Sequence, residues 1–171
     1  AQGSGDSAAG ACYPPAMPPP RLLFVCLGNI CRSPTAEAVT RALAERRGLA
    51  LDLDSAGTGD WHLGAPPDAR MQAAARAAGY DLSALRARQV GPDDFRRFDI
   101  LYAMDRQNAR DLAALRPAGA SAELRLFRTH DPEGGRDVPD PYLEGGFDGV
   151  LRLVERTAAR LLDDVERNGA A

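Results

Sequence analysis

The sequence contains no lysine, so all 21 of its basic residues are arginine, a bias that is typical of a GC-rich genome and says nothing about function. It has only three cysteines, an odd number that does not make a disulfide framework, and this predicts a reducing, cytoplasmic location. No apolar run is long enough to cross a bilayer, and no run of like charges is long enough for a nucleic-acid arm. With 24 acidic residues and a net charge of −3, nucleic acid and membrane are not expected as partners.

The chain is 171 residues long and 44% hydrophobic, which suits one domain with a substantial core. Residues 1–20 are mainly Gly, Ser, Ala and Pro, and we expect them to form a disordered extension. Within it, Met17 is a candidate natural initiator, with the residues before it a remnant added to the natural chain. Residues 21–168 are expected to form a single folded domain.

Strands and helices alternate along the folded part of the sequence. The apolar run Leu22–Cys26 is typical of a strand buried on both faces, and Ser33 followed by Pro34 predicts an N-cap and a helix that ends near Gly48. The other expected elements are strands at 49–55, 100–104 and 123–127, helices at 68–78, 105–115 and 147–165, a helical turn at 92–95 and a loop at 129–141. This alternation predicts an α/β three-layer sandwich with a central four-stranded parallel sheet flanked by helices.

The first predicted strand leads into the segment Cys26–Ser33. Ligands of open parallel sheets bind beyond the carboxyl ends of strands, so chemistry is expected here. Gly28 and Asn29 tolerate positive φ, which lets successive backbone N–H groups converge on one anion beside a helix N-terminus. A thiol at Cys26 would ionise readily in that positive field, and the thiolate is the nucleophile, while Arg32 offers a planar fork for two phosphate oxygens. The segment therefore predicts a phosphate loop after the first strand.

Less specific readings of this segment exist. A cysteine at a strand end is more often a small buried hydrophobe, and five residues between a cysteine and an arginine also occur by chance. The combination of buried strand, glycine-bearing loop and Ser-Pro helix start favours a nucleophile. A zinc site on Cys26 and Cys31 is not expected, because the spacing is not that of a metal knuckle and only His62 and His130 could complete it.

The segment Cys26-Leu-Gly-Asn-Ile-Cys-Arg-Ser33 resembles the phosphate loop of the low-molecular-weight protein tyrosine phosphatases, and Asp140-Pro-Tyr142 resembles the family's general-acid motif. The resemblance extends from about Arg21 to about Arg167. It implies hydrolysis of phosphotyrosine in protein substrates, and of small aryl phosphates, through a cysteinyl-phosphate intermediate. It also implies no metal or organic cofactor, since the protein supplies nucleophile, anion clamp and acid. A monomer or weak homo-oligomer is expected.

The resemblance gives each matching residue a role. Cys26 would attack phosphorus, Arg32 would hold the phosphate, and Asp140 would protonate the leaving phenolate and then activate water. Trp61 and Tyr142 match the aromatic walls that sandwich the substrate ring. The residues matching the phosphate-binding loop are Leu27, Gly28, Asn29, Ile30, Cys31 and Ser33, and those matching its hydrogen-bonded support are Asn29, Ser33 and Ser55.

Three alternative functions are compatible with parts of this pattern. A phosphoarginine phosphatase is the closest, but such relatives typically carry threonine at the position of Ile30. A thioredoxin-coupled arsenate reductase needs further cysteines, and none follows Cys31. An inactive phosphate-binding module would lack a catalytic residue, and none is missing.

The sequence departs from the family at two places. Leu85 stands where the family often has a histidine that buttresses the loop asparagine, which predicts that loop rigidity depends more heavily on Ser55. Leu143 stands where several relatives have a second tyrosine, which argues against regulation through a tyrosine pair.

Cys31 resembles the family's second cysteine and predicts a redox response. Peroxide would oxidise the Cys26 thiolate to a sulfenic acid, which would condense with the Cys31 thiol, releasing water and forming a disulfide. Peroxide should therefore abolish aryl-phosphate hydrolysis, and a thiol reductant should restore it. A Cys31→Ser variant should recover much less, and recovery as full as in the wild type would count against this role.

Overall fold

The computed structural model describes residues 18–168, so the expectation for residues 1–20 lies outside the described chain except at its last three prolines. Four parallel strands form one sheet in the order β2-β1-β3-β4. The strands are β1 (Arg21–Cys26), β2 (Asp52–Gly57), β3 (Ile100–Ala103) and β4 (Glu123–Leu126). The predicted four-stranded parallel sheet is confirmed.

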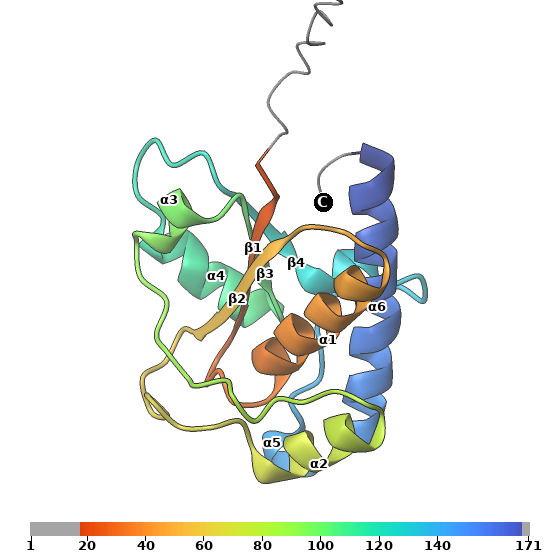
Figure 1. Cartoon of the computed structure of the whole chain (residues 1–171). Coiled ribbons are helices and arrows are strands. Elements are labelled where there is room, and N and C mark those ends of the chain that lie inside the picture. Colours follow the sequence, from red (N-terminus) through yellow and green to blue (C-terminus); the bar gives the residue numbers. More distant parts are fainter. Residues whose placement is uncertain (1–17, 169–171) are drawn as a thin grey trace, which may run out of the picture.

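Helices cover both faces of the sheet (Figure 1). On one face lie α1 (Arg32–Arg46) and α6 (Phe147–Asn168), and on the other lie α3 (Asp94–Arg97) and α4 (Arg106–Leu115). Two short helices, α2 (Ala69–Ala77) and α5 (Pro141–Glu144), lie near each other at the end of the molecule where the strands terminate, and a 3-10 turn, η1 (Phe127–His130), follows β4. Within residues 18–168, no helix combines the length and the apolar character that a bilayer span requires.

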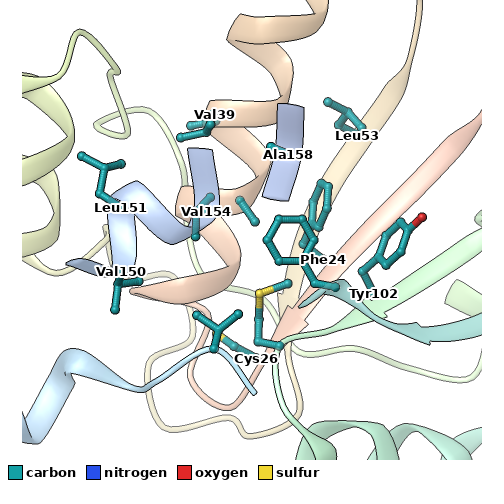
Figure 2. Packing of buried hydrophobic residues seen from close by; sticks show 14 of the residues in the cluster. Phe24, Cys26, Val39, Leu53, Tyr102, Val150, Leu151, Val154 and Ala158 are labelled. Atoms are coloured by element: carbon teal, nitrogen blue, oxygen red, sulfur yellow. The ribbon is translucent and has the colours of Figure 1, made fainter. Parts of the chain in front are cut away.

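Aromatic packing fixes the middle of β1 against its neighbours. The Phe24 ring stacks on Tyr102 of β3 with centroids 5.8 Å apart and meets the edge of Phe127 at 5.6 Å. On the face of the sheet that α1 and α6 cover, the same core includes Val39 of α1 and Val154 and Ala158 of α6 (Figure 2). Since β1 is the central strand of this core, its carboxyl end is held in one place.

The strand order places a crevice at the carboxyl ends of β1 and β3. From β1 the chain moves to β2 on one side and then crosses to β3 on the other, and such a switch point is where ligands bind in parallel sheets. Cys26 pairs with Gly57, and Val25 pairs with Ala103, so the loops after all three strands start at one level. A Cβ at Gly57 would lie 2.8 Å from the Leu27 carbonyl oxygen, so the phosphate loop packs directly on the backbone of β2.

Several elements differ from those predicted, three of them close to the candidate site. The first helix begins at Arg32 with Cys31 at its N-cap, because the Ser33 hydroxyl is directed to Cys26 and Asn29 and is not used as a cap. The second strand runs later than 49–55, since it is aligned with β1 from Asp52 onward. Helix α5 was expected to be loop, and its start is capped by the Asp140 side chain, which accepts from the Tyr142 N–H.

Phe24 offers a test of this packing. We expect Phe24→Ala to lower the free energy of unfolding by about 3–5 kcal/mol, because the substitution leaves a cavity between β1, β3 and Phe127. Urea unfolding measures this change. The matched control Leu63→Ala, at an exposed position, should stay within about 0.5 kcal/mol of wild type, and an equal loss in both variants would contradict the assignment of the core.

Candidate active site

The Cys26 thiol lies at the carboxyl end of β1, where the strand gives way to the phosphate loop. Its Sγ lies 3.0 Å from Ser33 Oγ and accepts the Asn29 backbone N–H at 3.3 Å. Ser33 stands in the first turn of α1, so the sulfur also faces the N-terminal end of that helix. Two hydrogen-bonding groups and a helix N-terminus therefore converge on the sulfur.

Asn29 holds the loop in this shape. It is the one non-glycine residue of the described chain with positive φ, at 55°. Its side-chain Nδ2 donates to Ser33 Oγ at 2.8 Å and to Ser55 Oγ at 3.0 Å, and its Oδ1 accepts from the Arg88 backbone N–H at 3.0 Å. Both amide hydrogens are therefore used, and α1, β2 and the segment at Arg88 converge on one buried side chain.

A buried carboxylate extends this network. Ser55 Oγ donates to Glu37 Oε1 at 2.7 Å, and Glu37, only 3% exposed, pairs with Arg41 at 2.8 Å. Because the Ser55 hydroxyl donates to Glu37, its oxygen is left to accept from the Asn29 side chain. Leu85 packs against the hydrophobic core, and the greater dependence of the loop on Ser55 stays a prediction.

Two hydrogen bonds from one of its nitrogens hold the Arg32 guanidinium in place. Its Nη1 donates to Asp105 Oδ2 at 2.7 Å and to the Val138 carbonyl oxygen at 3.0 Å, which leaves the Nε–Nη2 edge for the cavity. Burial works against its charge, but Cys26 and the Asp105 carboxylate outweigh burial and raise the pKa of Arg32. The guanidinium is thus a permanent cation with a planar edge suited to two phosphate oxygens.

The backbone of the loop adds further donors. Within residues 18–168, no hydrogen bond uses the N–H of Gly28, Ile30 or Cys31 as its donor. These N–H groups belong to a loop that bends around the Cys26 sulfur between the end of β1 and the start of α1. Such an arc of amides is a binding site for a tetrahedral anion.

One cavity joins most of the residues predicted from the sequence. Its lining comprises Cys26, Leu27, Gly28, Ile30, Cys31, Arg32, Trp61, His62, Asp140 and Tyr142. Asn29, Ser33 and Ser55 are absent from this lining and lie buried beneath the loop, where they support it. Asp140 Oδ2 stands 3.5 Å from Arg32 Nη2, so carboxyl and guanidinium share the same wall. The rings of Trp61 and Tyr142 lie at the mouth of the cavity, where the two residues are 72% and 41% exposed.

Cys31 shares the cavity with Cys26 but differs in its electrostatic environment. Burial, followed by the negative charge of Asp68, raises the pKa of the Cys31 thiol to about 12. Cys31 therefore remains protonated at neutral pH, which argues against Cys31 as the group that attacks phosphorus.

The structure adds residues that sequence reasoning missed. Asp105 directly follows the carboxyl end of the third predicted strand, which was a usable signal for a site residue. His62 lines the cavity, with its ring centroid 6.0 Å from that of Tyr142. Glu37 and Arg88 act beneath the loop, and no local pattern marks them, because their roles arise from contacts between distant segments.

The Asn29 network gives a testable prediction. Asn29→Asp keeps the shape but replaces two donors by acceptors and places a negative charge beside the sulfur. We expect kcat/KM for an aryl phosphate to fall at least about tenfold, and Cys26 to react more slowly with iodoacetamide at neutral pH, because the thiolate is destabilised. Ser55→Ala, which removes one acceptor and adds no charge, should cause a smaller loss. Wild-type alkylation and turnover in Asn29→Asp would contradict the role of the network.

Comparison with known proteins agrees with this geometry. The family profile described as "Low molecular weight phosphotyrosine protein phosphatase" matches residues 21–171. A low molecular weight protein-tyrosine-phosphatase of Streptomyces coelicolor is 45% identical over 150 residues, which cover 83% of this chain and 91% of the relative.

Solved structures show the same similarity. The crystal structure of YfkJ from Bacillus subtilis superposes with a TM-score of 0.84 at 37% identity, covering 89% of this chain and 98% of the other. A crystal structure titled as a Drosophila arginine phosphatase gives a TM-score of 0.79 at 31% identity, with 86% and 98% covered. By sequence, fold and the arrangement of its phosphate loop, the chain belongs to the low-molecular-weight phosphotyrosine protein phosphatase family.

Proposed function

We propose that this protein is a protein tyrosine phosphatase that works through a cysteinyl-phosphate intermediate. The observation that carries this proposal is that Cys26, Arg32 and Asp140 line one cavity whose mouth carries two aromatic rings. Nucleophile, anion clamp and proton donor are thereby gathered around one space that accepts a phosphorylated ring. Family membership supports the same reaction.

In the first step the Cys26 sulfur attacks phosphorus in line with the leaving phenolate oxygen. The S–P bond forms as the P–O bond to the ring breaks, and the Asp140 carboxyl gives its proton to the departing oxygen. Arg32 and the loop amides hold the three remaining phosphate oxygens, which carry the transition-state charge.

In the second step water attacks the cysteinyl phosphate. Asp140, now ionised, accepts a proton from that water, the S–P bond breaks, and inorganic phosphate forms. The Ser33 hydroxyl, 3.0 Å from the sulfur, donates to it as the thiolate departs. One carboxyl thus returns to its starting protonation state in each cycle.

The cavity walls support an aryl substrate. Trp61 and Tyr142 offer ring faces, and Leu27 and Ile30 complete an apolar lining above the anion site. Phosphoserine carries no ring to occupy this space. The resemblance to an arginine phosphatase structure keeps phosphoarginine as the alternative substrate, and the apolar Ile30 side chain supports phosphotyrosine instead.

The surface around the cavity supports a protein substrate. The large apolar side chains that are exposed in the described chain are Leu27, Trp61, Leu63, Tyr142 and Leu143. Three of them line the cavity, and the other two follow closely in sequence, so apolar surface continues beyond the aryl site. Such surface suits the residues that flank a phosphotyrosine. We infer a cytoplasmic site of action, because the catalytic thiol must stay reduced.

The test is phosphate release from peptides carrying phosphotyrosine, phosphoserine or phosphoarginine, using wild type, Cys26→Ser and Asp140→Asn. We expect phosphotyrosine to be the preferred substrate and Cys26→Ser to be inactive. Asp140→Asn should lower kcat by about 10²–10⁴-fold, because it can neither donate nor accept the transferred proton.

Mass spectrometry of rapidly quenched wild-type reactions should show a phosphoryl group on Cys26. Retained turnover by Cys26→Ser would remove the proposed nucleophile. Faster release from phosphoarginine than from phosphotyrosine would replace the proposed substrate class with the alternative.

A further inference from the structure

Helix α2 begins at a residue that is tied to the phosphate loop. The Asp68 backbone N–H donates to the Ile30 carbonyl oxygen at 2.8 Å. The Asp68 carboxylate caps the helix by accepting the N–H groups of Arg70 at 2.8 Å and Met71 at 3.3 Å. The same carboxylate accepts from the Arg70 guanidinium at 3.1 Å and 2.9 Å. The Arg70 side chain is therefore held at one end by a group whose backbone contacts the nucleophile's loop.

The same guanidinium also contacts the segment that carries Asp140. Its Nη2 donates to the Tyr142 carbonyl oxygen at 3.0 Å. Its guanidinium carbon lies 5.7 Å from the centroid of the Tyr142 ring and 4.7 Å from that of Phe147, distances at which a cation is attracted to a ring. One arginine thus contacts both the backbone and the ring at the entrance to the cavity.

The segment 139–145 has few other attachments. Among the hydrogen bonds of residues 18–168, the Tyr142 carbonyl is the only backbone group of this segment that bonds to a residue outside it. Upstream the backbone is tied at Val138, which donates to the Met104 carbonyl and accepts from Arg32. Downstream, Gly145 and Gly146 both have positive φ, of 80° and 84°, at the turn into α6. Asp140 itself is tied to the rest of the protein by its 3.5 Å ion pair with Arg32.

We propose that Arg70 is a positioning residue for the general acid. Asp68, Arg70 and Tyr142 form a strut between the phosphate loop and the segment that carries Asp140, and this strut sets the distance between nucleophile and proton donor. The inference rests on the proposed function and deepens it, since it concerns how Asp140 is placed and not whether Asp140 acts.

The physical reason is the strict geometry of proton transfer. The Asp140 carboxyl must lie within hydrogen-bond reach of the leaving oxygen while phosphorus is in line with Cys26. A displacement of about 1 Å in such an arrangement can cost about a hundredfold in rate. Without the strut, the Arg32 pair would be the one polar contact between residues 139–145 and the rest of the described chain, beside the buried Pro141 and the contact of the Tyr142 ring with His62.

The experiment compares Arg70→Ala and Arg70→Lys with Arg76→Ala as the matched control. Arg76 lies in the last turn of the same helix and is exposed, and its side chain makes no hydrogen bond or ion pair within the described residues. Lysine at position 70 keeps the charge, but it lacks the planar fork that reaches Asp68 and the Tyr142 carbonyl together. Thermal unfolding of each variant establishes that it is folded.

The decisive readout is kcat/KM for p-nitrophenyl phosphate and for phenyl phosphate. Phenolate is the poorer leaving group and needs the proton more. We expect Arg70→Ala to lose about tenfold or more on phenyl phosphate and less than about threefold on p-nitrophenyl phosphate, with Arg70→Lys between wild type and alanine. Arg76→Ala should match wild type on both substrates.

An equal loss on both substrates, or no loss on either, would overturn the proposal. Absence of wild-type turnover on every aryl phosphate would instead overturn the proposed function. Amide hydrogen exchange separates the two without any turnover: the amides of Tyr142 and Gly145, which are hydrogen-bonded within the segment, should exchange at least about tenfold faster in Arg70→Ala than in wild type or Arg76→Ala. Unchanged exchange there would also refute the strut.

Discussion

The catalytic site depends on one buried amide side chain, that of Asn29. A left-handed backbone at a non-glycine residue costs about 1 kcal/mol, and the three hydrogen bonds that its side chain makes offset this cost. With the backbone bent at this point, the loop amides turn inward around the Cys26 sulfur. The same side chain joins α1, β2 and the segment at Arg88, so the nucleophile's surroundings are held by three distant parts of the chain.

The layers of the fold could be read from the sequence because its signals are local. A continuous apolar run marks β1, and a long helical repeat of apolar residues marks α6. Boundaries were less accurate where tertiary contacts decide them. Ser33 and Pro34 have the chemistry of a helix start, yet the Ser33 hydroxyl is engaged at the thiol, and the helix begins one residue earlier. The short helix α5 has too few residues for any periodicity to appear.

The candidate site likewise has one part that local sequence signals predict and another part that tertiary contacts decide. The proposed nucleophile and the proposed anion-binding arginine lie in one short segment, so their spacing indicates the chemistry. The aromatic walls and the proposed acid were predicted from family resemblance. Asp105, Glu37 and Arg70 contact that machinery from elements far along the chain, and which elements meet is decided by the strand order. A single sequence does not contain that information in any local pattern.

The contact between Gly57 and the Leu27 carbonyl has a consequence for engineering. The Leu27 backbone of the phosphate loop packs directly on the main chain of Gly57. Any side chain introduced at position 57 would therefore displace this loop. A designer who wants a wider or differently shaped cavity should therefore keep glycine at position 57. The exposed Trp61 ring at the rim can be exchanged instead, since it takes no part in the hydrogen bonds that shape the loop.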